Sequence, residues 1–395
     1  MKKLMILGAS YSQLPLYEAA RQLGAATVAA STPGDWPGFD VADESVYADI
    51  TDPEAILAAA QEKGIDGIAT SCLDAGVRAL GYTCEKMGLI GPSARAADIS
   101  NDKFKMKEAF MAGGVQCARH ICIHSLEELE EALEKLEFPV VLKAVDLMGS
   151  RGIFRCNTRE ETFFYYNKTM EATRKDYCLV EEFIEGQVLG CEAMIRDGRL
   201  LYCLPNNIEA FQSYVPTPIG HSVPYRKQEE LGAEVRHQVE LAIKAVGLDN
   251  CPVNCDLIEK DGKIYVIEIT GRAGGTCLPE MVSIYYGINY YEAIVRLALG
   301  MDVEEMFRGK TAGVANLSRT LLSEKDGVVK AIHNENEPAE DIVNLSFNIT
   351  PGEEVHHYTN GRDRLGQVIL RGESLESCEK RLQEILSKIN IEFTV

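Results

Sequence analysis

Residues 253 to 275 contain the pattern that most constrains the fold, because two alternating apolar runs flank the turn residues Asp261-Gly262. An Asp-Gly pair between two such runs is a strong signal for a β-hairpin. Asp256 lies in the first run and Glu268 in the second, twelve positions apart, so the hairpin places two carboxylates side by side. Neighbouring carboxylates repel each other unless a cation lies between them, and Mg²⁺ is usually held by one or two carboxylates plus substrate phosphates. An ordinary exposed hairpin with two solvated acids is the alternative.

The length and charge of the chain exclude several classes of protein. At 395 residues the chain is too long for one ordinary core, so two or three domains are expected. A net charge of −20 argues against a nucleic-acid partner, because phosphate backbones require a basic surface. No apolar run approaches the roughly 20 residues that span a bilayer, and the N-terminus lacks a secretory signal. We therefore expect a cytoplasmic protein that binds neither nucleic acid nor membrane.

The cysteines and histidines indicate no metal site. The twelve cysteines are scattered along the chain without any C-x-x-C pair, whereas zinc ligands normally come in closely spaced pairs. The seven histidines form no ligand pattern either. We expect reduced, structural thiols.

Residues 1 to 95 alternate strands and helices, the pattern of a doubly wound α/β domain with a mostly parallel sheet. The turn at residues 8 to 12 lacks the full glycine fingerprint of a dinucleotide site. Ser10, Ser71 and Asp74 follow predicted strands. These polar residues indicate a small ligand at the carboxyl edge of the sheet.

The central region contains a lysine and a glycine loop that suit nucleotide phosphates. Lys143 ends an apolar strand and precedes a loop with Gly149 and Gly152, after which a return strand is predicted. Loop amides can bind phosphate oxygens and the ammonium adds a point charge; a lysine that merely extends to solvent from a strand end is the alternative. Residues 180 to 186 predict a strand that passes into a turn, whose backbone can bind the edge of a base. The sequence contains no Walker motif.

Two further segments complete the chain. Residues 205 to 225 contain several Pro and aromatic residues and predict a long loop. This loop either lines an acceptor site, with Tyr214 or His221 in contact with ligand, or is a structural connection with a packed tyrosine. From about residue 306 a smaller α+β unit is expected.

The order of these pieces, with Asp102-Lys103 between the first domain and Lys143, resembles the ATP-grasp superfamily of carboxylate–amine ligases. The chain is similar to the branch that contains biotin carboxylase, carbamoyl-phosphate synthetase, the carboxyaminoimidazole-forming purine enzymes and the L-amino-acid ligases. The resemblance implies three domains. They are an N-terminal Rossmann-like pre-ATP-grasp domain (1–95), a central ATP-grasp domain (96–305) with a lid subdomain at about 115–190, and a small C-terminal α+β domain (306–395).

The resemblance also implies the nucleotide site, with ATP as cofactor. The implied contacts are Lys103, Lys143, Gly149, Ser150, Arg151, Gly152, Glu181, Glu182 and Ile184. The lysines contact ATP and the loop at residues 147 to 153 covers its phosphates. Glu181 and Ile184 occupy the hinge position that gives its backbone to adenine, with Glu182 beside them.

The implied metal is Mg²⁺, with Mn²⁺ as the alternative. Asp256, Glu268 and Thr270 correspond to the metal ligands, although the family usually has asparagine where Thr270 stands. Arg272 corresponds to the arginine that steadies the anionic acyl phosphate. A ribose-binding glutamate is usual where Val188 stands, so the ribose contact is left open.

The implied reaction activates a small carboxylate, an amino acid or another metabolite, as an acyl phosphate and joins it to an amine, releasing ADP and phosphate. Activation is needed because oxide is too poor a leaving group for an amine to displace. Small-molecule carboxylate and amine substrates are the expected partners. The sequence leaves the oligomeric state open, with a homodimer as one alternative. Two alternatives stay open: a bicarbonate-activating enzyme of the carboxylase or carbamoyl-phosphate type, and a nucleotide-binding module without catalysis.

Overall fold

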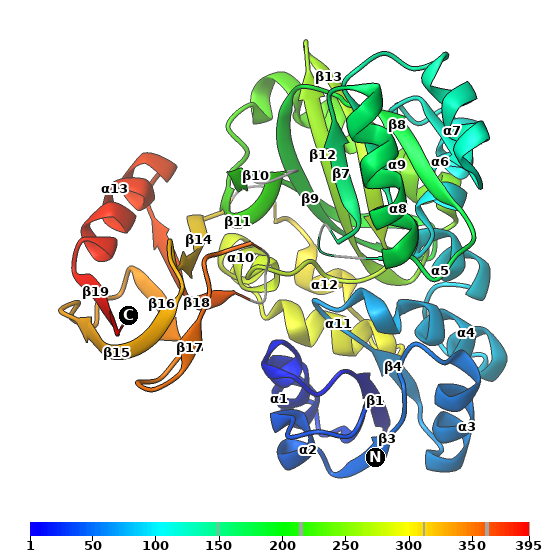
Figure 1. The fold of residues 1–395 in the computed structure, drawn as a ribbon. Helices are drawn as coiled ribbons and strands as arrows, with labels where there is room; N and C mark the ends of the chain where they lie inside the picture. The colour runs from blue at the N-terminus through cyan, green and yellow to red at the C-terminus, as the bar shows by residue number, and fades with distance from the viewer. Residues whose placement is uncertain (148, 150, 213–215, 311–312, 360–362, 395) are drawn as a thin grey trace.

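The structure is a computed structural model that describes residues 1–395 except 148, 150, 213–215, 311–312, 360–362 and 395. Its described residues form a parallel sheet near the N-terminus, a small antiparallel sheet, a long eight-stranded sheet and a three-stranded sheet near the C-terminus (Figure 1). No described helix is both long and apolar enough to cross a membrane. All twelve cysteines have free thiols, and seven of them are buried, as expected for structural thiols.

The N-terminal sheet is parallel throughout, in the order β3-β2-β1-β4. Its strands are β1 (Lys3–Leu7), β2 (Ala26–Ser31), β3 (Glu44–Tyr47) and β4 (Gly67–Ala69). The connecting helices are η1 (Tyr11–Gln13), α1 (Leu14–Gln22), α2 (Pro37–Val41), α3 (Pro53–Lys63), η2 (Asp74–Gly76) and α4 (Val77–Met87). Helix α3 begins at Pro53 because the Asp52 side chain accepts hydrogen bonds from two backbone N–H groups of its first turn. The predicted doubly wound α/β pattern is confirmed.

The small antiparallel sheet has the order β5-β8-β6-β7. Its strands are β5 (His120–Ile123), β6 (Val140–Lys143), β7 (Ile153–Cys156) and β8 (Cys178–Glu182). The helices of this region are α5 (Ala94–Ser100), α6 (Lys103–Ala112), α7 (Leu126–Leu133) and α8 (Arg159–Ala172). Lys143 pairs with Ile153 across β6 and β7, so the glycine loop returns the chain as the sequence predicts. The boundaries of the three domains and of the lid subdomain stay predictions.

The long sheet has the order β13-β12-β9-β10-β11-β14-β18-β16. Its strands are β9 (Gln187–Arg196), β10 (Arg199–Gln212), β11 (Pro216–Val223), β12 (Cys251–Lys260), β13 (Lys263–Thr270), β14 (Ala315–Leu322), β16 (Ile342–Phe347) and β18 (Arg364–Gly372). Helix α9 (Gln228–Val246) packs its apolar residues against one face, with Leu189, Cys191 and Ala193 of β9 in the same core. Because side chains alternate across a strand, Gly190 and Glu192 of β9 lie on the opposite face.

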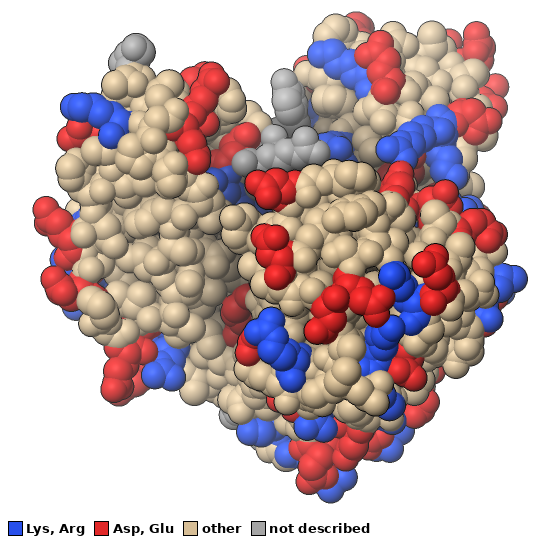
Figure 2. All heavy atoms as spheres, turned by 90° about the horizontal axis from the view of Figure 1, so that it is seen from below, with Lys and Arg blue, Asp and Glu red and all other residues tan. Residues whose placement is uncertain are grey.

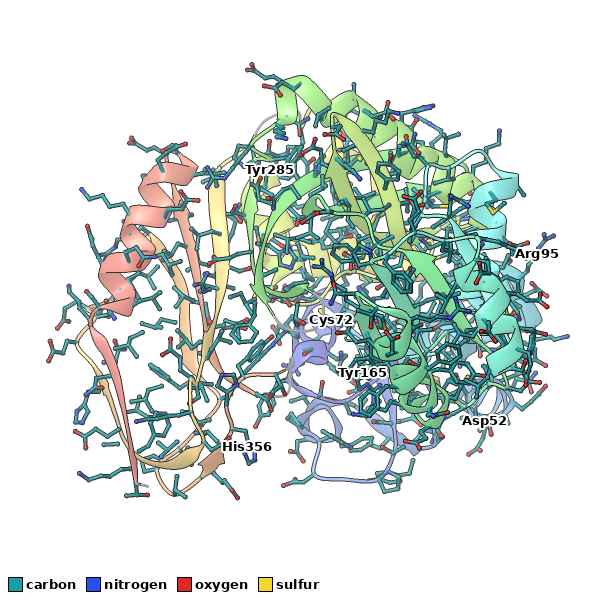
Figure 3. The ribbon with its side chains drawn as sticks, turned by 45° about the horizontal axis from the view of Figure 1, so that its top comes forward. Asp52, Cys72, Arg95, Tyr165, Tyr285 and His356 are labelled. Atoms are coloured by element: carbon teal, nitrogen blue, oxygen red, sulfur yellow. The ribbon has the colours of Figure 1, made fainter. Side chains whose placement is uncertain are left out.

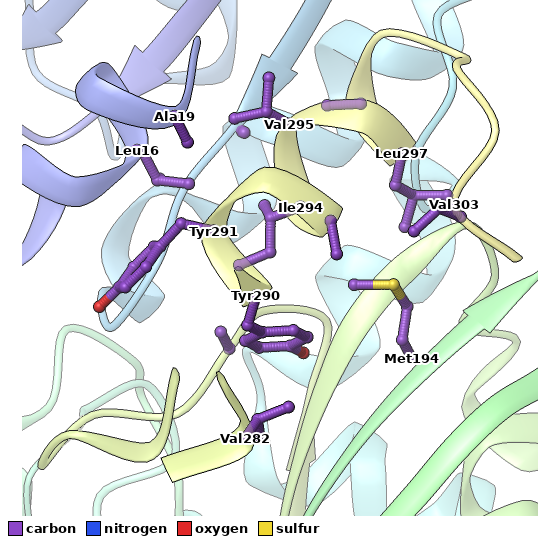
Figure 4. Packing of buried hydrophobic residues seen from close by; sticks show 14 of the residues in the cluster. Leu16, Ala19, Met194, Val282, Tyr290, Tyr291, Ile294, Val295, Leu297 and Val303 are labelled. Carbon is purple, nitrogen blue, oxygen red and sulfur yellow. The ribbon is translucent and has the colours of Figure 1, made fainter. Parts of the chain in front are cut away.

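A second core joins the long sheet to the N-terminal sheet. Helices α10 (Leu278–Tyr286) and α11 (Tyr290–Ala298) lie between them, followed by α12 (Glu304–Phe307). Figure 4 shows Leu16 and Ala19 of α1 facing α11, while Met194 of β9 approaches α11 from the other side. This packing fixes the N-terminal sheet against the strands that carry the candidate site.

The prediction of a long loop at residues 205 to 225 is wrong. Most of the segment forms the end of β10 and strand β11, which pair antiparallel. Prolines are rare inside sheets because they lack a backbone donor, and the several prolines of this segment therefore disguised the strands. Tyr214 lies outside the described residues. His221 lies in β11, buried and hydrogen-bonded to Asn206 with 2.9 Å between Nδ1 and Oδ1.

The C-terminal unit shares the long sheet. Strand β14 pairs with β11, and β18 and β16 follow it. The remaining strands, β15 (Gly327–Asn334), β17 (Glu354–Val355) and β19 (Ile389–Thr394), form the three-stranded sheet beside helix α13 (Leu375–Leu386). In the view from below, the described acidic and basic side chains are interspersed, and this face has no broad basic area (Figure 2).

Candidate active site

Asp256 and Glu268 are paired residues on the β12–β13 hairpin, where the register shifts by one residue between Asp256 and Leu257. Asp261 and Gly262 at its turn have φ of +52° and +75°, the left-handed conformation that a tight hairpin turn of this kind requires. Opposite residues of an antiparallel pair point to the same face. Burial raises the pKa of Asp256, and the neighbouring Glu268 carboxylate raises it further, to about 7. A cation bound between the two groups would remove this repulsion.

The donor atoms of this hairpin fit a hard divalent cation. Thr270 is two residues beyond Glu268 and therefore on the same face; its hydroxyl oxygen is buried near the Asp74 carboxylate, whose pKa it helps to lower. Among all the residues that the structure describes, no group of three or more His, Cys, Asp or Glu side chains could hold a metal by itself. Two carboxylates and a hydroxyl suit Mg²⁺, which takes its other ligands from phosphates and water.

A cavity of about 190 Å³ adjoins the carboxylate pair and is lined by residues of the small and the long sheets. The predicted residues that line it are Lys103, Lys143, Gly149, Glu181, Glu182, Ile184, Asp256 and Glu268. Val141, Phe183, Leu257 and other apolar residues form the rest of its wall. The cavity thus combines apolar surface for a planar base with charged groups for phosphates.

Lys103 connects the start of α6 to the hairpin and to the glycine loop. Its Nζ lies 3.2 Å from Glu268 Oε2 and donates a hydrogen bond of 2.9 Å to the Leu147 carbonyl oxygen. Burial lowers the pKa of Lys103, but the attraction of Glu268, with smaller contributions from Asp74 and Glu181, outweighs burial, so its pKa is raised. Asp102 fixes the helix start, because its carboxylate accepts hydrogen bonds from two backbone N–H groups of the first turn.

Glu181 lies between two lysine side chains. One carboxylate oxygen pairs with Lys143, and the other lies 3.1 Å from Lys107 Nζ. Burial raises the pKa of Glu181, but the two ammonium groups outweigh it and lower the pKa to about 2. Lys107 is not among the residues predicted from the sequence, although it follows Lys103 by four positions, the spacing of neighbours on one helix face. The backbone contact of Glu181 with adenine stays a prediction.

The glycine loop borders the cavity through Gly149. Gly149 and Gly152 have φ of +64° and +66°, a conformation that side chains disfavour. A Cβ atom on Gly152 would also come within 2.8 Å of Ala144 Cβ. Arg151 is exposed, and Ser150 lies outside the described residues. Phosphate contacts of this loop stay a prediction.

Arg272 is held by the N-terminal domain. Its Nε and Nη2 donate to the two carboxylate oxygens of Asp74, both at 2.7 Å, and its Nη1 donates to Asn254 Oδ1 and the Ala273 carbonyl oxygen. Burial raises the pKa of Asp74, but Arg272 outweighs it and lowers the pKa. Cys72, near the centre of the molecule in Figure 3, also binds Ala273 through its backbone N–H. Asp74, predicted from the sequence only as a strand-end residue, thus meets the candidate site.

Glu192 is a further buried acid near Arg272. It accepts hydrogen bonds from Asn254 Nδ2 at 2.7 Å and from the Gly274 N–H, and burial raises its pKa to about 8. Val188, at the position where the family usually has a ribose-binding glutamate, lines the cavity. Glu192 supports the Arg272 segment instead. Its position in the middle of an apolar strand gave no sign of this contact.

Known proteins with the same arrangement support the resemblance read from the sequence. The chain matches the ATP-grasp domain model over residues 100–276 and the model of L-amino acid ligase C-terminal domain 2 over residues 319–394. It is 39% identical to a crystal structure described as phosphoribosylglycinamide synthetase from Anaerococcus prevotii, with all of both chains covered and a TM-score of 0.85. The chain belongs to the ATP-grasp ligase family.

Three further relatives of this ATP-grasp protein have lower sequence identity. An L-amino acid ligase from Bacillus licheniformis has the same fold, with a TM-score of 0.85 at 20% identity over 100% of this chain and 99% of that one. Alanine–anticapsin ligase of Bacillus subtilis is 25% identical over 64% of this chain and 58% of its own. The carbamoyl phosphate synthase large chain of Clostridium beijerinckii is 22% identical over 78% of this chain. The chain spans only 30% of that large chain's length.

Proposed function

We propose that this ATP-grasp protein activates a small carboxylate as an acyl phosphate and joins it to an amine, releasing ADP and phosphate. The observation that carries the proposal is the Asp256–Glu268 pair in the wall of a cavity that Lys103 and Lys143 also line. The match of residues 319–394 to an L-amino acid ligase domain favours an amino acid as the carboxylate substrate. Homodimerisation and a cytoplasmic location stay predictions from the sequence.

The side chains around the cavity have separate roles in this proposal. Residues 181 to 184 and the apolar wall receive the adenine base, and Lys103 and Lys143 bind the phosphates as charge-assisted donors. Asp256, Glu268 and Thr270 would hold Mg²⁺, which supplies positive charge at the phosphates when bound. Phosphoryl transfer depends mainly on positioning and charge neutralisation, and these groups provide both.

The proposed reaction has two steps, phosphoryl transfer and then attack by the amine. A substrate carboxylate oxygen attacks the γ-phosphorus, the bond from this phosphorus to the bridging oxygen breaks, and ADP leaves. The nitrogen of a neutral amine then attacks the acyl carbon, the bond from this carbon to the phosphate oxygen breaks, and the nitrogen releases a proton. Arg272, beside the hairpin, would stabilise the anionic acyl phosphate.

We expect a substrate labelled with ¹⁸O in its carboxylate to transfer one labelled oxygen to inorganic phosphate. The label moves because the carboxylate oxygen that attacks phosphorus stays with it when the amine displaces the phosphate. A screen for ADP release with single amino acids and amino-acid pairs would first identify the substrates, and mass spectrometry of the phosphate would then measure the label. Label in AMP would establish adenylation and contradict the proposal, and unlabelled phosphate would exclude the acyl phosphate.

We expect Lys143→Ala to weaken ATP binding by about 1.5–3 kcal/mol, the usual contribution of a hydrogen bond to a charged group. Isothermal titration of ATP against the wild-type and variant proteins measures the difference. Lys168→Ala is a suitable control, because Lys168 lies on α8 over the Phe164 and Tyr165 rings and does not line the cavity. Equal ATP affinity of wild type and Lys143→Ala would contradict the assignment.

A further inference from the structure

Lys107, Glu181 and Lys143 form a buried charge cluster at the nucleotide cavity. The side chains of Lys107 and Glu181 are 3% and 2% exposed, and that of Lys143 is 12% exposed. Lys107 Nζ also lies 3.4 Å from the Val266 carbonyl oxygen of the hairpin. All three residues line the cavity, but only Glu181 and Lys143 belong to the site predicted from the sequence.

The charges of this cluster do not cancel. Glu181 stays ionised because two ammonium groups surround its carboxylate, so the cluster has two positive charges and one negative charge. Without Lys107, Glu181 and Lys143 would form a neutral one-to-one pair. The positive charge available to a phosphate near Lys143 would then be largely cancelled, since little water is present to screen the carboxylate.

The geometry indicates that Lys107 acts through Glu181. Each carboxylate oxygen of Glu181 has its own lysine: Oε1 pairs with Lys143 and Oε2 pairs with Lys107. Lys107 is also one helical turn beyond Lys103 on α6. Lys103 pairs with the metal-site carboxylate Glu268, whereas Lys107 pairs with the carboxylate at the hinge end of β8. The helix therefore supports both ends of the cavity.

We propose that Lys107 is a positioning residue for the nucleotide: it neutralises Glu181 and so leaves the charge of Lys143 available to the ATP phosphates. This inference rests on the proposed ATP-dependent function. Lys107 needs no contact of its own with the phosphates. Removal of Lys107 should therefore weaken the binding of ligands that contain phosphate, and it should do so only while Glu181 carries its charge.

The first test compares ATP with adenosine in the variant Lys107→Met, which keeps the length of the side chain. We expect the ATP dissociation constant to rise about tenfold or more, and that of adenosine to change by less than about twofold, because only the phosphates respond to the lost charge. Lys105→Met is the matched control, since Lys105 lies on the same helix, pairs with Asp98 and does not line the cavity. Equal losses for ATP and adenosine would assign Lys107 to the structure of the base pocket and overturn the proposal.

The second test is the double variant Lys107→Met/Glu181→Gln. It removes one positive and one negative charge and returns the cluster to a single positive charge on Lys143. We expect ATP affinity to recover most of the loss seen in Lys107→Met, with thermal unfolding as the check that each variant is folded. Failure to recover in a folded double variant would show a direct phosphate contact or a packing role and would overturn the proposal. If wild type does not bind ATP, the proposed function itself fails; if wild type binds ATP and Lys107→Met binds it equally, only this inference fails.

Discussion

Glu268→Gln is expected to lower turnover by roughly a thousandfold while the protein stays folded, because a neutral amide would replace one of the two carboxylates of the proposed metal site. The Glu268 side chain is 40% exposed, so its loss should affect the core little. Lys103 also loses its ion-pair partner in this variant. Rates of ADP release across a Mg²⁺ titration would measure the effect, and removal of metal with a chelator should abolish turnover of the wild type.

Two variants serve as controls for this result. Glu259→Gln removes a carboxylate from the same hairpin that pairs with Lys227 and does not line the cavity, so turnover should stay near the wild-type value. Thr270→Asn restores the amide that is usual in the family and should be tolerated or should tighten metal binding. Ordinary activity in Glu268→Gln would show that the hairpin is not the metal site.

Arg272→Ala is expected to reduce turnover by roughly a hundredfold or more while ATP affinity changes by less than about threefold. The guanidinium lies beside the hairpin on the side of the N-terminal domain and does not line the nucleotide cavity. Its loss should therefore affect the anionic intermediate and not the nucleotide. Steady-state rates and ATP titration, both measured on the same protein, separate the two effects.

The contacts of Arg272 require a second variant. Four of its five N–H groups already donate to Asp74, Asn254 and Ala273, and Arg272→Ala leaves the Asp74 carboxylate unpaired, which should lower the free energy of unfolding by about 3 kcal/mol. Asp74→Asn keeps a hydrogen-bonding side chain but weakens the tie between domains. If Arg272 acts on the reacting anion, Asp74→Asn retains most turnover. An equal loss of turnover in both variants would show that Arg272 serves only to hold the two domains together.

Local signals in the sequence predicted those parts of the site that depend on neighbouring residues. The Asp261-Gly262 turn joins β12 to β13 and sets their register as far as the Leu257–Val266 pair. A shift of one residue between Asp256 and Leu257 then brings Glu268 opposite Asp256, and the turn alone does not predict that shift. The Asp74–Arg272 pair joins residues 198 positions apart. Nothing near either residue indicates its partner, because the contact depends on how two domains pack.

Lys107 and the β10–β11 hairpin show two further limits of prediction from the sequence. A lysine on a helix is usually solvated, and Lys107 is buried only because Glu181 arrives from a strand of the small sheet. The strands of residues 205 to 225 contain prolines, which are normally absent from the middle of a sheet. In both cases, tertiary partners outweigh the local preference of the residue.

The pairing of β11 with β14 has a consequence for engineering hybrid ligases. Backbone pairs from Gly220–Arg319 to Val223–Asn316 carry one sheet across the junction between the ATP-grasp region and the C-terminal unit. A swap of the C-terminal unit between family members, made to transfer substrate choice, would therefore cut a hydrogen-bonded ladder and leave β11 as an unprotected edge, which invites aggregation. A seam placed farther into the sheet meets the same constraint, because β10 also pairs with β9 through an antiparallel ladder. A hybrid must therefore keep the register of whichever strand pair its seam divides.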